Sequence, residues 1–353
     1  MCNFATNIDV RINEAYSTKD KYVFNWLLTG AILIMLMVVI GGITRLTQSG
    51  LSMVKWEPIM GTIPPMSEES WNEVFELYKQ SPEFRHYNSD FTLSDFKGIY
   101  FWEYLHRLIG RILGLVFLVP CVFFGLKKYF REGYKQKVII IFLWGGFQGV
   151  LGWLMVKSGL VDNPHVSHYR LAAHLITALG LIGYIFWVAL SLKYEVISYT
   201  QKKLKRIVQW FIGIVFLQII YGAFVAGLKA GKGYNTFPKM GEQWFPSEFS
   251  IIYKREGFIS LMESAGLVQF MHRIFAYLVV VFLIIIIYQA RNILDGIQKT
   301  CLRLVIVAVG LQFLLGVLTL LYAVPISLGV VHQFGAIVVL ITSILFLYSI
   351  KKV

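Results

Sequence analysis

The sequence predicts an all-α polytopic membrane protein with eight transmembrane helices, arranged as two pseudosymmetric four-helix bundles. Three observations support this fold class. Of the 353 residues, 57% are hydrophobic and 15% are charged, and the mean hydropathy is +0.63, which is too apolar for a soluble globular protein. Apolar windows of about 20 residues recur along the chain. Motifs from the first half return in the second half, which indicates an internal duplication.

Each apolar window is long enough to cross about 30 Å of hydrocarbon. Pro325 separates the last two windows, because proline interrupts or ends a helix. We expect transmembrane helices at Phe24 to Thr44, Tyr100 to Leu126, Val138 to Val156, His168 to Leu192, Ile207 to Leu228, Ala265 to Tyr288, Leu302 to Tyr322 and Ile326 to Ile350.

The positions of Lys and Arg predict the orientation in the membrane. They concentrate in the N-terminal tail, at the C-terminus and in the loops after the second, fourth and sixth helices, whereas the loop after the third helix holds only Lys157. Because loops on the inner side carry an excess of Lys and Arg, the N and C termini should both lie inside. This bias explains the net charge of +13, so membrane lipid is the expected partner and no nucleic acid is expected.

The N-terminal tail at residues 1–23 contains Asp9, Glu14 and Asp20 and has no short apolar core. It fits neither a secretory signal peptide nor an acid-poor transit peptide. We therefore expect an uncleaved integral protein of the bacterial plasma (inner) membrane, with the mitochondrial inner membrane as the less favoured alternative.

The two halves share several features in the same order. Pro-x-Met-Gly follows the first helix at Pro58 and the fifth helix at Pro238, and QGVLG in the third helix matches QFLLG in the seventh. We therefore divide the chain into the tail, an N-terminal half at 24–200 with an outer loop at 45–99, and a C-terminal half at 201–353 with an outer loop at 229–264. Within the first outer loop, Ser67 to Gln80 is predicted to form an amphipathic surface helix, and we hypothesise that it covers the N-terminal site.

Histidines mark the even helices. His106, His174, His272 and His332 lie one each in the second, fourth, sixth and eighth helices. Each is six to eight residues from the expected outer end, so all four should lie about 9 to 12 Å below the outer surface. Four histidines at one depth in matched halves indicate a shared ligand.

Paired imidazoles on facing helices suit the axial positions of a haem iron. A proton relay would favour a ladder of carboxylates, and a zinc or copper site would usually add Cys, Met or a third histidine. The residue four positions after each histidine is small, which leaves room for a flat macrocycle, although membrane helix interfaces are rich in small residues anyway. These small residues are Gly110, Ala178, Ala276 and Ala336.

Four arginines lie in the expected hydrocarbon region, each close in sequence to one of the histidines. A buried guanidinium needs an anion, and haem propionates match its two-pronged geometry. The alternative is pairing with Glu103 or with helix carbonyl groups. The propionate-binding candidates are Arg107, Arg111, Arg170 and Arg273.

Taken together, these residues resemble the haem A synthases, the Cox15/CtaA family, over nearly the whole chain. EYLHR at Glu103 to Arg107 is similar to the family's Glu-x-x-His-Arg motif, and GGITRLTQSGLSM resembles the start of its first outer loop. The resemblance implies an oxidoreductase that converts haem O to haem A for terminal oxidases, by successive hydroxylations of a ring methyl to a formyl group.

The resemblance also implies roles for particular residues. His106 and His174 would hold the substrate haem O, His272 and His332 would hold a haem b cofactor, and Glu103 would be the essential catalytic carboxylate. Some members carry two cysteines in the first outer loop, but residues 45–99 contain none, so this chain resembles the branch without that pair. The implied partners are haem O supplied by a haem O synthase and an acceptor for the electrons, and a homo-oligomer is compatible with the sequence.

Glu103 precedes His106 by three residues, which places it on the same helix face and about 4.5 Å nearer the outer surface. There it could accept a proton or stabilise a developing cation. Gln269 occupies the matching position in the second half, so we expect only the N-terminal half to react. The structural alternative is a helix N-terminal glutamate favoured by the helix dipole.

Two other functions share part of this pattern. A dihaem membrane cytochrome b that transfers electrons from quinol would share the four histidines, but it would usually stack its haems across the membrane. A transporter built from two repeats would usually have broken helices near the middle of the membrane, and the sequence shows none.

Overall fold

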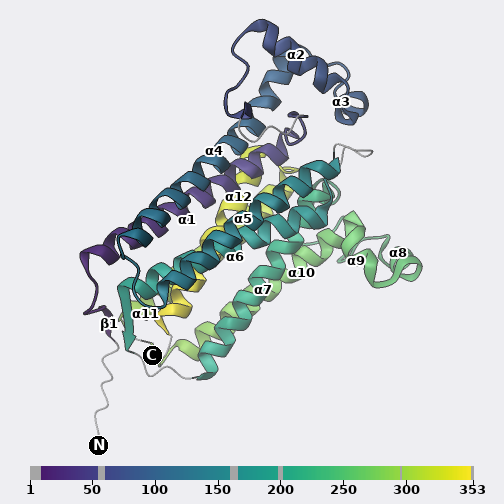
Figure 1. Cartoon of the computed structure of the whole chain (residues 1–353). Helices are drawn as coiled ribbons and strands as arrows, with labels where there is room; N and C mark the ends of the chain where they lie inside the picture. Colours follow the sequence, from purple (N-terminus) through teal and green to yellow (C-terminus); the bar gives the residue numbers. More distant parts are fainter. Residues whose placement is uncertain (1–8, 55–59, 160–165, 198–201, 295, 351–353) are drawn as a thin grey trace, which may run out of the picture.

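Eight helices in the described part of the chain are long and apolar enough to span a membrane in this computed structural model (Figure 1). The structure describes residues 9–54, 60–159, 166–197, 202–294 and 296–350. The spanning helices are α1 (Thr18–Leu46), α4 (Leu93–Leu126), α5 (Tyr134–Gly159), α6 (His168–Lys193), α7 (Lys202–Gly227), α10 (Ala265–Ala290), α11 (Gly296–Leu321) and α12 (Ile326–Ser349). All eight expected helices are confirmed, and Pro325 is the N-cap of α12.

Several helices begin earlier than the apolar windows predict, because polar caps extend them. Helix α1 begins at Thr18, where Ser17 accepts a hydrogen bond from the backbone N–H of Asp20 and the Asp20 carboxylate accepts one in return. Helix α4 begins at Leu93 behind a similar cap at Thr92. Glu103 therefore lies well inside α4, and the interpretation of this residue as a helix N-terminal glutamate is wrong.

The helices form two rings of four that meet in the centre of the molecule. Helices α1, α6, α7 and α12 pack against one another in the centre, while α4, α5, α10 and α11 lie at the periphery beside α1, α6, α7 and α12 respectively. Leu27, Ile182, Val208 and Leu340 are fully buried in the central core. The peripheral pair of each ring packs loosely, both α4 on α5 and α10 on α11.

Short helices cover one end of the bundle. Helices α2 (Glu68–Lys79) and α3 (Pro82–Tyr87), which we call the outer cap, pack on the extended start of α4 (Figure 1). Phe75 and Tyr78 of α2 stack on Phe96 of α4, so aromatic packing holds the cap. The expected helix at Ser67 to Gln80 is thus confirmed. The second outer loop contains α8 (Phe249–Glu256), α9 (Ser260–Glu263) and the 3₁₀ turns η2 (Ala230–Lys232) and η3 (Gly257–Ile259), while η1 (Met60–Thr62) belongs to the first.

A small sheet at the opposite end departs from the all-α expectation. Strand β1 (Asp9–Ile12) pairs antiparallel with β2 (Tyr194–Ile197), which follows α6. The Tyr348 hydroxyl of α12 donates to the carbonyl of Tyr194 at 2.7 Å. The N-terminal segment, the α6–α7 connection and the end of α12 therefore meet at one end of the bundle (Figure 1).

Candidate haem site

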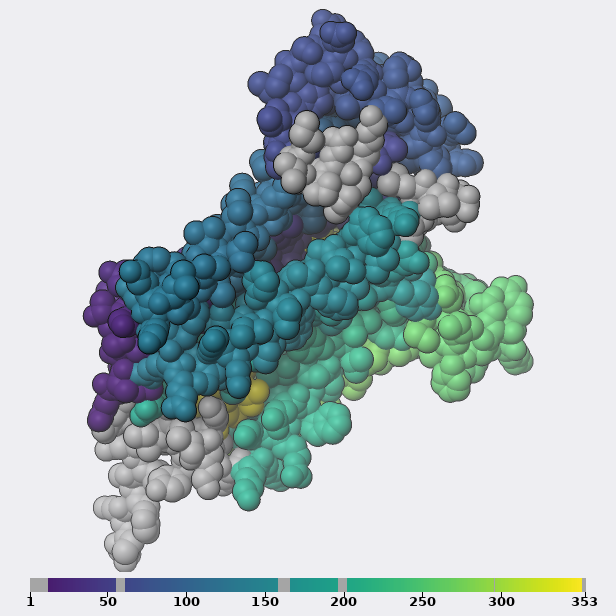
Figure 2. Space-filling view, viewed as in Figure 1, coloured from purple at the N-terminus to yellow at the C-terminus, as the bar shows by residue number. Residues whose placement is uncertain are grey.

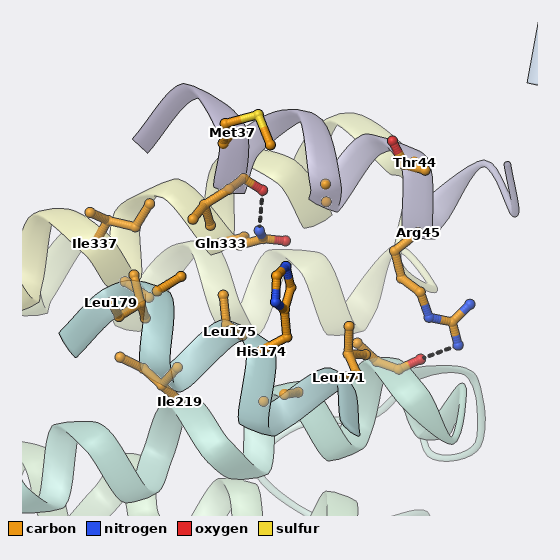
Figure 3. A pocket seen from close by; sticks show the side chains of 18 of the residues that line it. Met37, Thr44, Arg45, Leu171, His174, Leu175, Leu179, Ile219, Gln333 and Ile337 are labelled. Atoms are coloured by element: carbon orange, nitrogen blue, oxygen red, sulfur yellow. Dashed lines mark hydrogen bonds between the residues drawn. The ribbon is translucent and has the colours of Figure 1, made fainter. Parts of the chain in front are cut away.

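One cavity of about 1640 Å³ reaches into both halves of the molecule. Pockets for a single drug-sized ligand usually measure about 300 to 1,000 Å³, so this cavity can hold more than one such group. All four predicted histidines line it: His106, His174, His272 and His332. Figure 3 shows the side chain of His174 pointing from α6 into this space.

The histidines approach each other in pairs within each half. The imidazoles of His106 on α4 and His174 on α6 are close enough to interact electrostatically. The imidazoles of His272 on α10 and His332 on α12 are also within this range. The structure thus brings together the two histidines of each half, as the sequence predicts.

A glycine of the neighbouring odd-numbered span lies against each imidazole. A methyl group added at these glycines would lie 2.9 to 3.4 Å from the ring, and at Gly41, Gly222 and Gly316 this is tighter than ordinary van der Waals contact. The pairs, with the distance from the added Cβ to the nearest ring atom, are Gly41 and His106 (3.2 Å), Gly152 and His174 (3.4 Å), Gly222 and His272 (3.2 Å), and Gly316 and His332 (2.9 Å). Each imidazole therefore packs directly against one of these four glycines, which we call the glycine seats, and an added side chain at Gly316 would force the ring of His332 to move.

Three of these glycines have a glutamine one turn away on the same helix. The side-chain nitrogen of Gln218 lies 3.3 Å from Nε2 of His272, and that of Gln312 donates to the carbonyl of His332 at 2.9 Å. Gln148 donates to Thr177 at 2.6 Å, and with its amide turned over its nitrogen lies 3.1 Å from Nδ1 of His174.

Sequence reasoning noticed QGVLG and QFLLG only as a repeat. The third copy, QIIYG at Gln218 to Gly222, was the signal that could have identified these glutamines as neighbours of the histidines.

These residues fit two haem groups better than a compact metal site. Nδ1 of His272 and Nδ1 of His332 are buried without a hydrogen-bond partner among the described residues. In the same part of the chain, no group of three or more His, Cys, Asp or Glu residues could hold a metal ion. Pairs of imidazoles without a third protein ligand match the axial positions of haem iron.

Glu103 is a buried carboxylate held by three groups. It is 3% exposed and accepts hydrogen bonds from the Ser52 hydroxyl at 2.7 Å and the Met53 backbone N–H at 2.8 Å. Its other oxygen forms an ion pair with Arg107 at 2.5 Å, and Arg107 also donates to the carbonyl of Met53. Glu103 and Arg107 thus fasten the start of the first outer loop beside His106.

The matching residues of the C-terminal half fasten the second outer loop. Gln269 donates to the carbonyl of Ala230 at 3.1 Å, and Arg273 donates to the carbonyls of Tyr234 and Lys239 at 3.0 Å each. The two halves therefore use the same positions for the same structural purpose. The chemical difference between them is a carboxylate in one half and an amide in the other.

The four predicted arginines are placed differently from one another. Arg107, Arg111 and Arg273 line the cavity, whereas Arg170 is not part of its lining and donates to the carbonyl of Leu154 at 2.9 Å. Arg107 and Arg273 make the carboxylate and carbonyl contacts described above. Arg107 pairs with Glu103, Arg170 with a helix carbonyl and Arg273 with loop carbonyls, so these three make structural contacts.

Sequence reasoning missed Arg45 at the end of α1, which lines the cavity together with Arg107, Arg111 and Arg273. Its guanidinium donates to the carbonyls of Ala226 and Gly227 at 3.0 Å each, near the end of α7. Figure 3 shows this side chain crossing from α1 to the neighbouring helix. It joins the two halves at the outer end of the cavity.

The outer cap contributes a second buried carboxyl group to the cavity. Glu83 and Tyr87 of α3 line its outer end. Glu83 is 7% exposed and accepts a hydrogen bond from the Tyr78 hydroxyl at 3.1 Å. Burial raises the pKa of Glu83 to about 7, and the hydrogen bond from Tyr78 and the nearby Lys229 charge oppose this rise.

Comparisons with known proteins show similarity over nearly the whole chain. A family described as a cytochrome oxidase assembly protein, COX15-CtaA, matches residues 24–344. A protein named heme A synthase from Flavobacterium psychrophilum is 46% identical over 336 residues, which are 94% of this chain and 99% of the relative. Proteins of the same name from Flavobacterium johnsoniae and Parvibaculum lavamentivorans are 44% and 40% identical, and the alignments cover 95% and 98% of this chain and 99% and 100% of the relatives.

Proposed function

The chain belongs to the COX15-CtaA family of cytochrome oxidase assembly proteins, and from this membership we propose that it is a haem A synthase. The enzyme is an oxidoreductase that oxidises a ring methyl group of haem O to a formyl group by successive hydroxylations. The observation that carries the proposal is that four histidines line one cavity as two electrostatically interacting pairs, with a carboxylate beside only one pair.

We assign the two histidine pairs to two different haem groups. His106 and His174 hold the substrate haem O, and His272 and His332 hold a resident haem b. Haem b supplies one-electron transfer when it is bound. The glycine seats support haem ligation in both halves, because they leave each cavity-lining imidazole free of crowding by a side chain at that position.

We assign the proton chemistry to Glu103. The carboxylate lies on the same helix as His106, is buried, and has a non-titrating counterpart in Gln269. Removing hydrogen from a methyl group releases protons as well as electrons, so a fixed carboxylate beside the reacting edge gives the proton a place to go. Arg107 and Ser52 hold that carboxylate in position.

The comparisons give no support to the alternative of a dihaem cytochrome b that only transfers electrons from quinol. The relatives reported above carry the name of a biosynthetic enzyme. Simple electron transfer leaves the carboxylate of Glu103 with only its structural role in the first outer loop, whereas a reaction that releases protons also uses its basicity.

We also propose that the outer cap acts as a lid over the N-terminal site. Glu83 and Tyr87 of the cap line the outer end of the cavity, which supports this role. Removal of α2 and α3 should lower the turnover of haem O, and unchanged turnover would argue against a lid.

Reconstitution tests the proposed activity directly. The purified protein in bacterial lipid, supplied with an acceptor for the electrons, should convert added haem O to a haem that carries a formyl group, seen by its altered absorption spectrum and its mass. A protein that binds haem O and reduces or oxidises it without forming the aldehyde would instead be an electron carrier.

A further inference from the structure

We propose that haem O enters the N-terminal site sideways from the bilayer, through an opening between α4 and α5 that we call the lateral opening. We further propose that side chains close the equivalent opening of the C-terminal half. This inference rests on the proposed function, because it names the route by which that substrate reaches its histidines.

Three glycines border the lateral opening. Gly114 of α4 and Gly145 and Gly149 of α5 all line the cavity and are exposed. A methyl group added at any of them would meet no atom within 4 Å, so the space beside each one is empty. Figure 2 shows the surface hollowed between these two helices, with purple atoms of α1 visible at the bottom. The cavity is therefore open towards the periphery on this side.

The same positions in the C-terminal half carry bulky side chains. His272 corresponds to His106 and Gln312 to Gln148, and this register places Val280, Val309 and Phe313 where Gly114, Gly145 and Gly149 stand. Val309 is 5% exposed, and Val280 is partly buried in the core.

An aromatic cluster completes the closure of the C-terminal half. The ring of Phe313 packs against those of Phe237 and Tyr277, with centroids 6.0 and 6.2 Å apart. Helices α10 and α11 pack as loosely as α4 and α5 do, so the backbone leaves a similar gap in both halves. The difference between the halves is therefore made by side chains alone.

The lateral opening faces hydrocarbon. Exposed apolar side chains surround it on both helices, and in a spanning helix such side chains contact lipid. They include Leu115, Leu118, Leu143, Phe147 and Val150. The outer end of the cavity is instead covered by the outer cap, which contributes Glu83 and Tyr87 to the lining. A membrane-dissolved substrate would therefore meet the site from the side.

The chemistry of haem O fits this entrance. It is a flat, largely apolar macrocycle with two carboxylates, so its body suits the glycine-lined gap and its charge suits a cation. Arg111 lines the cavity on α4 at the position that Tyr277 occupies in the other half. A substrate must enter and its product must leave, whereas a resident haem b is better retained by a closed wall. The open and closed halves match these two needs.

Transplanting the closure into the N-terminal half tests the proposal. The double variant Gly145→Val with Gly149→Phe restores the side chains of the C-terminal half. Purified protein in phosphatidylcholine nanodiscs is mixed with vesicles that carry haem O, and its uptake is followed by absorbance and by extraction of the bound haem. We expect uptake and release of haem O to slow by about tenfold or more, an added barrier of about 1.4 kcal/mol, with haem b content and final haem O occupancy unchanged.

Two further variants make the result specific. Gly213→Phe introduces the same ring at an exposed glycine of α7 that is outside the cavity lining and has no atom near its Cβ position, and it should leave uptake unchanged. Phe313→Ala removes the closure of the other half and should speed the loss of haem b to acceptor vesicles. If the double variant fails to accumulate, Phe313→Ala tests whether side chains control haem exchange. An unchanged rate of haem b loss in this variant would overturn the proposal.

The possible results separate the route from the function. Uptake at the wild-type rate in a double variant that retains haem b overturns the lateral opening. A large loss of final haem O occupancy also overturns it, because residue 149 would then lie on the binding surface rather than at an entrance. A wild-type protein that takes up no haem O at all refutes the proposed function itself.

Discussion

Glu103 is the residue at which an observed structural role and the proposed chemical role coincide. Three donors hold its carboxylate: the Ser52 hydroxyl, the Met53 backbone N–H and the Arg107 guanidinium. These contacts orient the group and also tie the first outer loop to α4. A change at this position can therefore act on the chemistry, on the loop, or on both.

Replacing Glu103 with glutamine should separate haem binding from turnover. Glutamine keeps the size and can still accept one hydrogen bond, but it cannot take up a proton. Because ground-state binding comes from the histidines and the cavity walls, we expect normal haem content and a loss of formyl product of about 10²- to 10⁴-fold. Haem O or a hydroxylated intermediate should accumulate, as measured by chromatography of extracted haem.

Ser52→Ala provides the control for the loop. It removes one hydrogen bond to Glu103 and leaves the carboxylate and its ion pair with Arg107 in place. It should reduce formyl product far less than Glu103→Gln does. Equal losses in the two variants would show that Glu103 serves only to fasten the loop.

The sequence predicts the site residues that reveal themselves by type and spacing along a single helix. His106 and Glu103 stand out because polar residues three apart on an apolar helix share one face. The glycines and glutamines beside the histidines did not stand out, because each contacts a histidine on a different helix and the sequence does not show which helices are neighbours. Gly222 becomes informative only when the rotation of α7 places it against His272.

At the scale of helices, the same contact recurs: a glycine on one helix packs against the histidine imidazole of a neighbouring helix. Helix α11 supplies Gly316 to His332 of α12, and α7 supplies Gly222 to His272 of α10. This contact sets how closely the two helices approach. The outer cap is a second kind of element contact, because its aromatic residues hold α2 and α3 on the extended start of α4.

Gly316→Ala should displace the imidazole of His332. The added Cβ would lie 2.9 Å from a ring atom of a histidine that is packed inside the bundle, so the ring must move. By analogy with other changes next to metal ligands, we expect haem b affinity to fall about ten- to a hundredfold. Pyridine haemochrome assays on the purified protein measure this loss.

Gly310→Ala on the same helix is the matched control. Its added Cβ meets no atom within 4 Å, and the residue is exposed and lies outside the cavity lining. Haem b content should remain at the wild-type level. A similar loss in both variants would mean that any alanine in α11 disturbs the bundle.

The outer cap should lose stability as the pH rises from about 4.5 to 7. Burial raises the pKa of Glu83 from its ordinary value of 4.5 to about 7, while the Tyr78 hydrogen bond and Lys229 oppose the shift and Glu103 adds to it. Between these values the folded cap holds a proton that the unfolded segment has released, so stability is greatest below pH 4.5 and falls until about pH 7. The difference is no more than about 3 kcal/mol.

Hydrogen exchange of the α3 amides at several pH values, corrected for intrinsic rates, measures this effect. Glu83→Gln has no proton to lose and should remove the pH dependence between pH 5 and 7. If the wild-type cap is equally protected across this range, Glu83 does not titrate with the raised pKa.

On the scale of the whole molecule, two similar rings have acquired different properties through a few side chains. Glu103 occupies the position in the first half that Gln269 occupies in the second. In the same way, Gly145 and Gly149 of the first half correspond to Val309 and Phe313 of the second. Arg45 and the packing of α1, α6, α7 and α12 hold the rings together. These differences are what the proposed division requires, with one half for reaction and substrate exchange and the other for retention of a haem.

The sequence predicts this architecture well because membrane-spanning helices can be recognised from the length and apolar composition of their segments. The eight spans follow from the apolar windows, and the break between the last two follows from Pro325. The early starts of α1 and α4 do not, because polar caps such as Ser17 and Thr92 extend a helix beyond its apolar part. The β1–β2 pair was missed because its strands are short and come from distant parts of the chain.

The division of labour between the halves predicts opposite results for equivalent histidine variants. His272→Ala removes one ligand of the proposed resident haem, so the purified protein should lose most of its tightly bound haem b and still take up haem O spectroscopically. It should form no aldehyde, because electrons would have no carrier in the C-terminal half. His174→Ala should keep haem b and lose the uptake of haem O.

Haem content, the spectrum after haem O addition and the extracted product together distinguish these outcomes. The exposed His86 of the outer cap provides the control, since His86→Ala removes an imidazole without touching the cavity lining. If His174→Ala empties the resident haem and His272→Ala abolishes haem O uptake, the assignment of the two halves is reversed. The lateral opening between α4 and α5 argues against that reversal. A resident cofactor in the N-terminal half would be exposed to the bilayer beside Gly114, Gly145 and Gly149, where no side chain covers it.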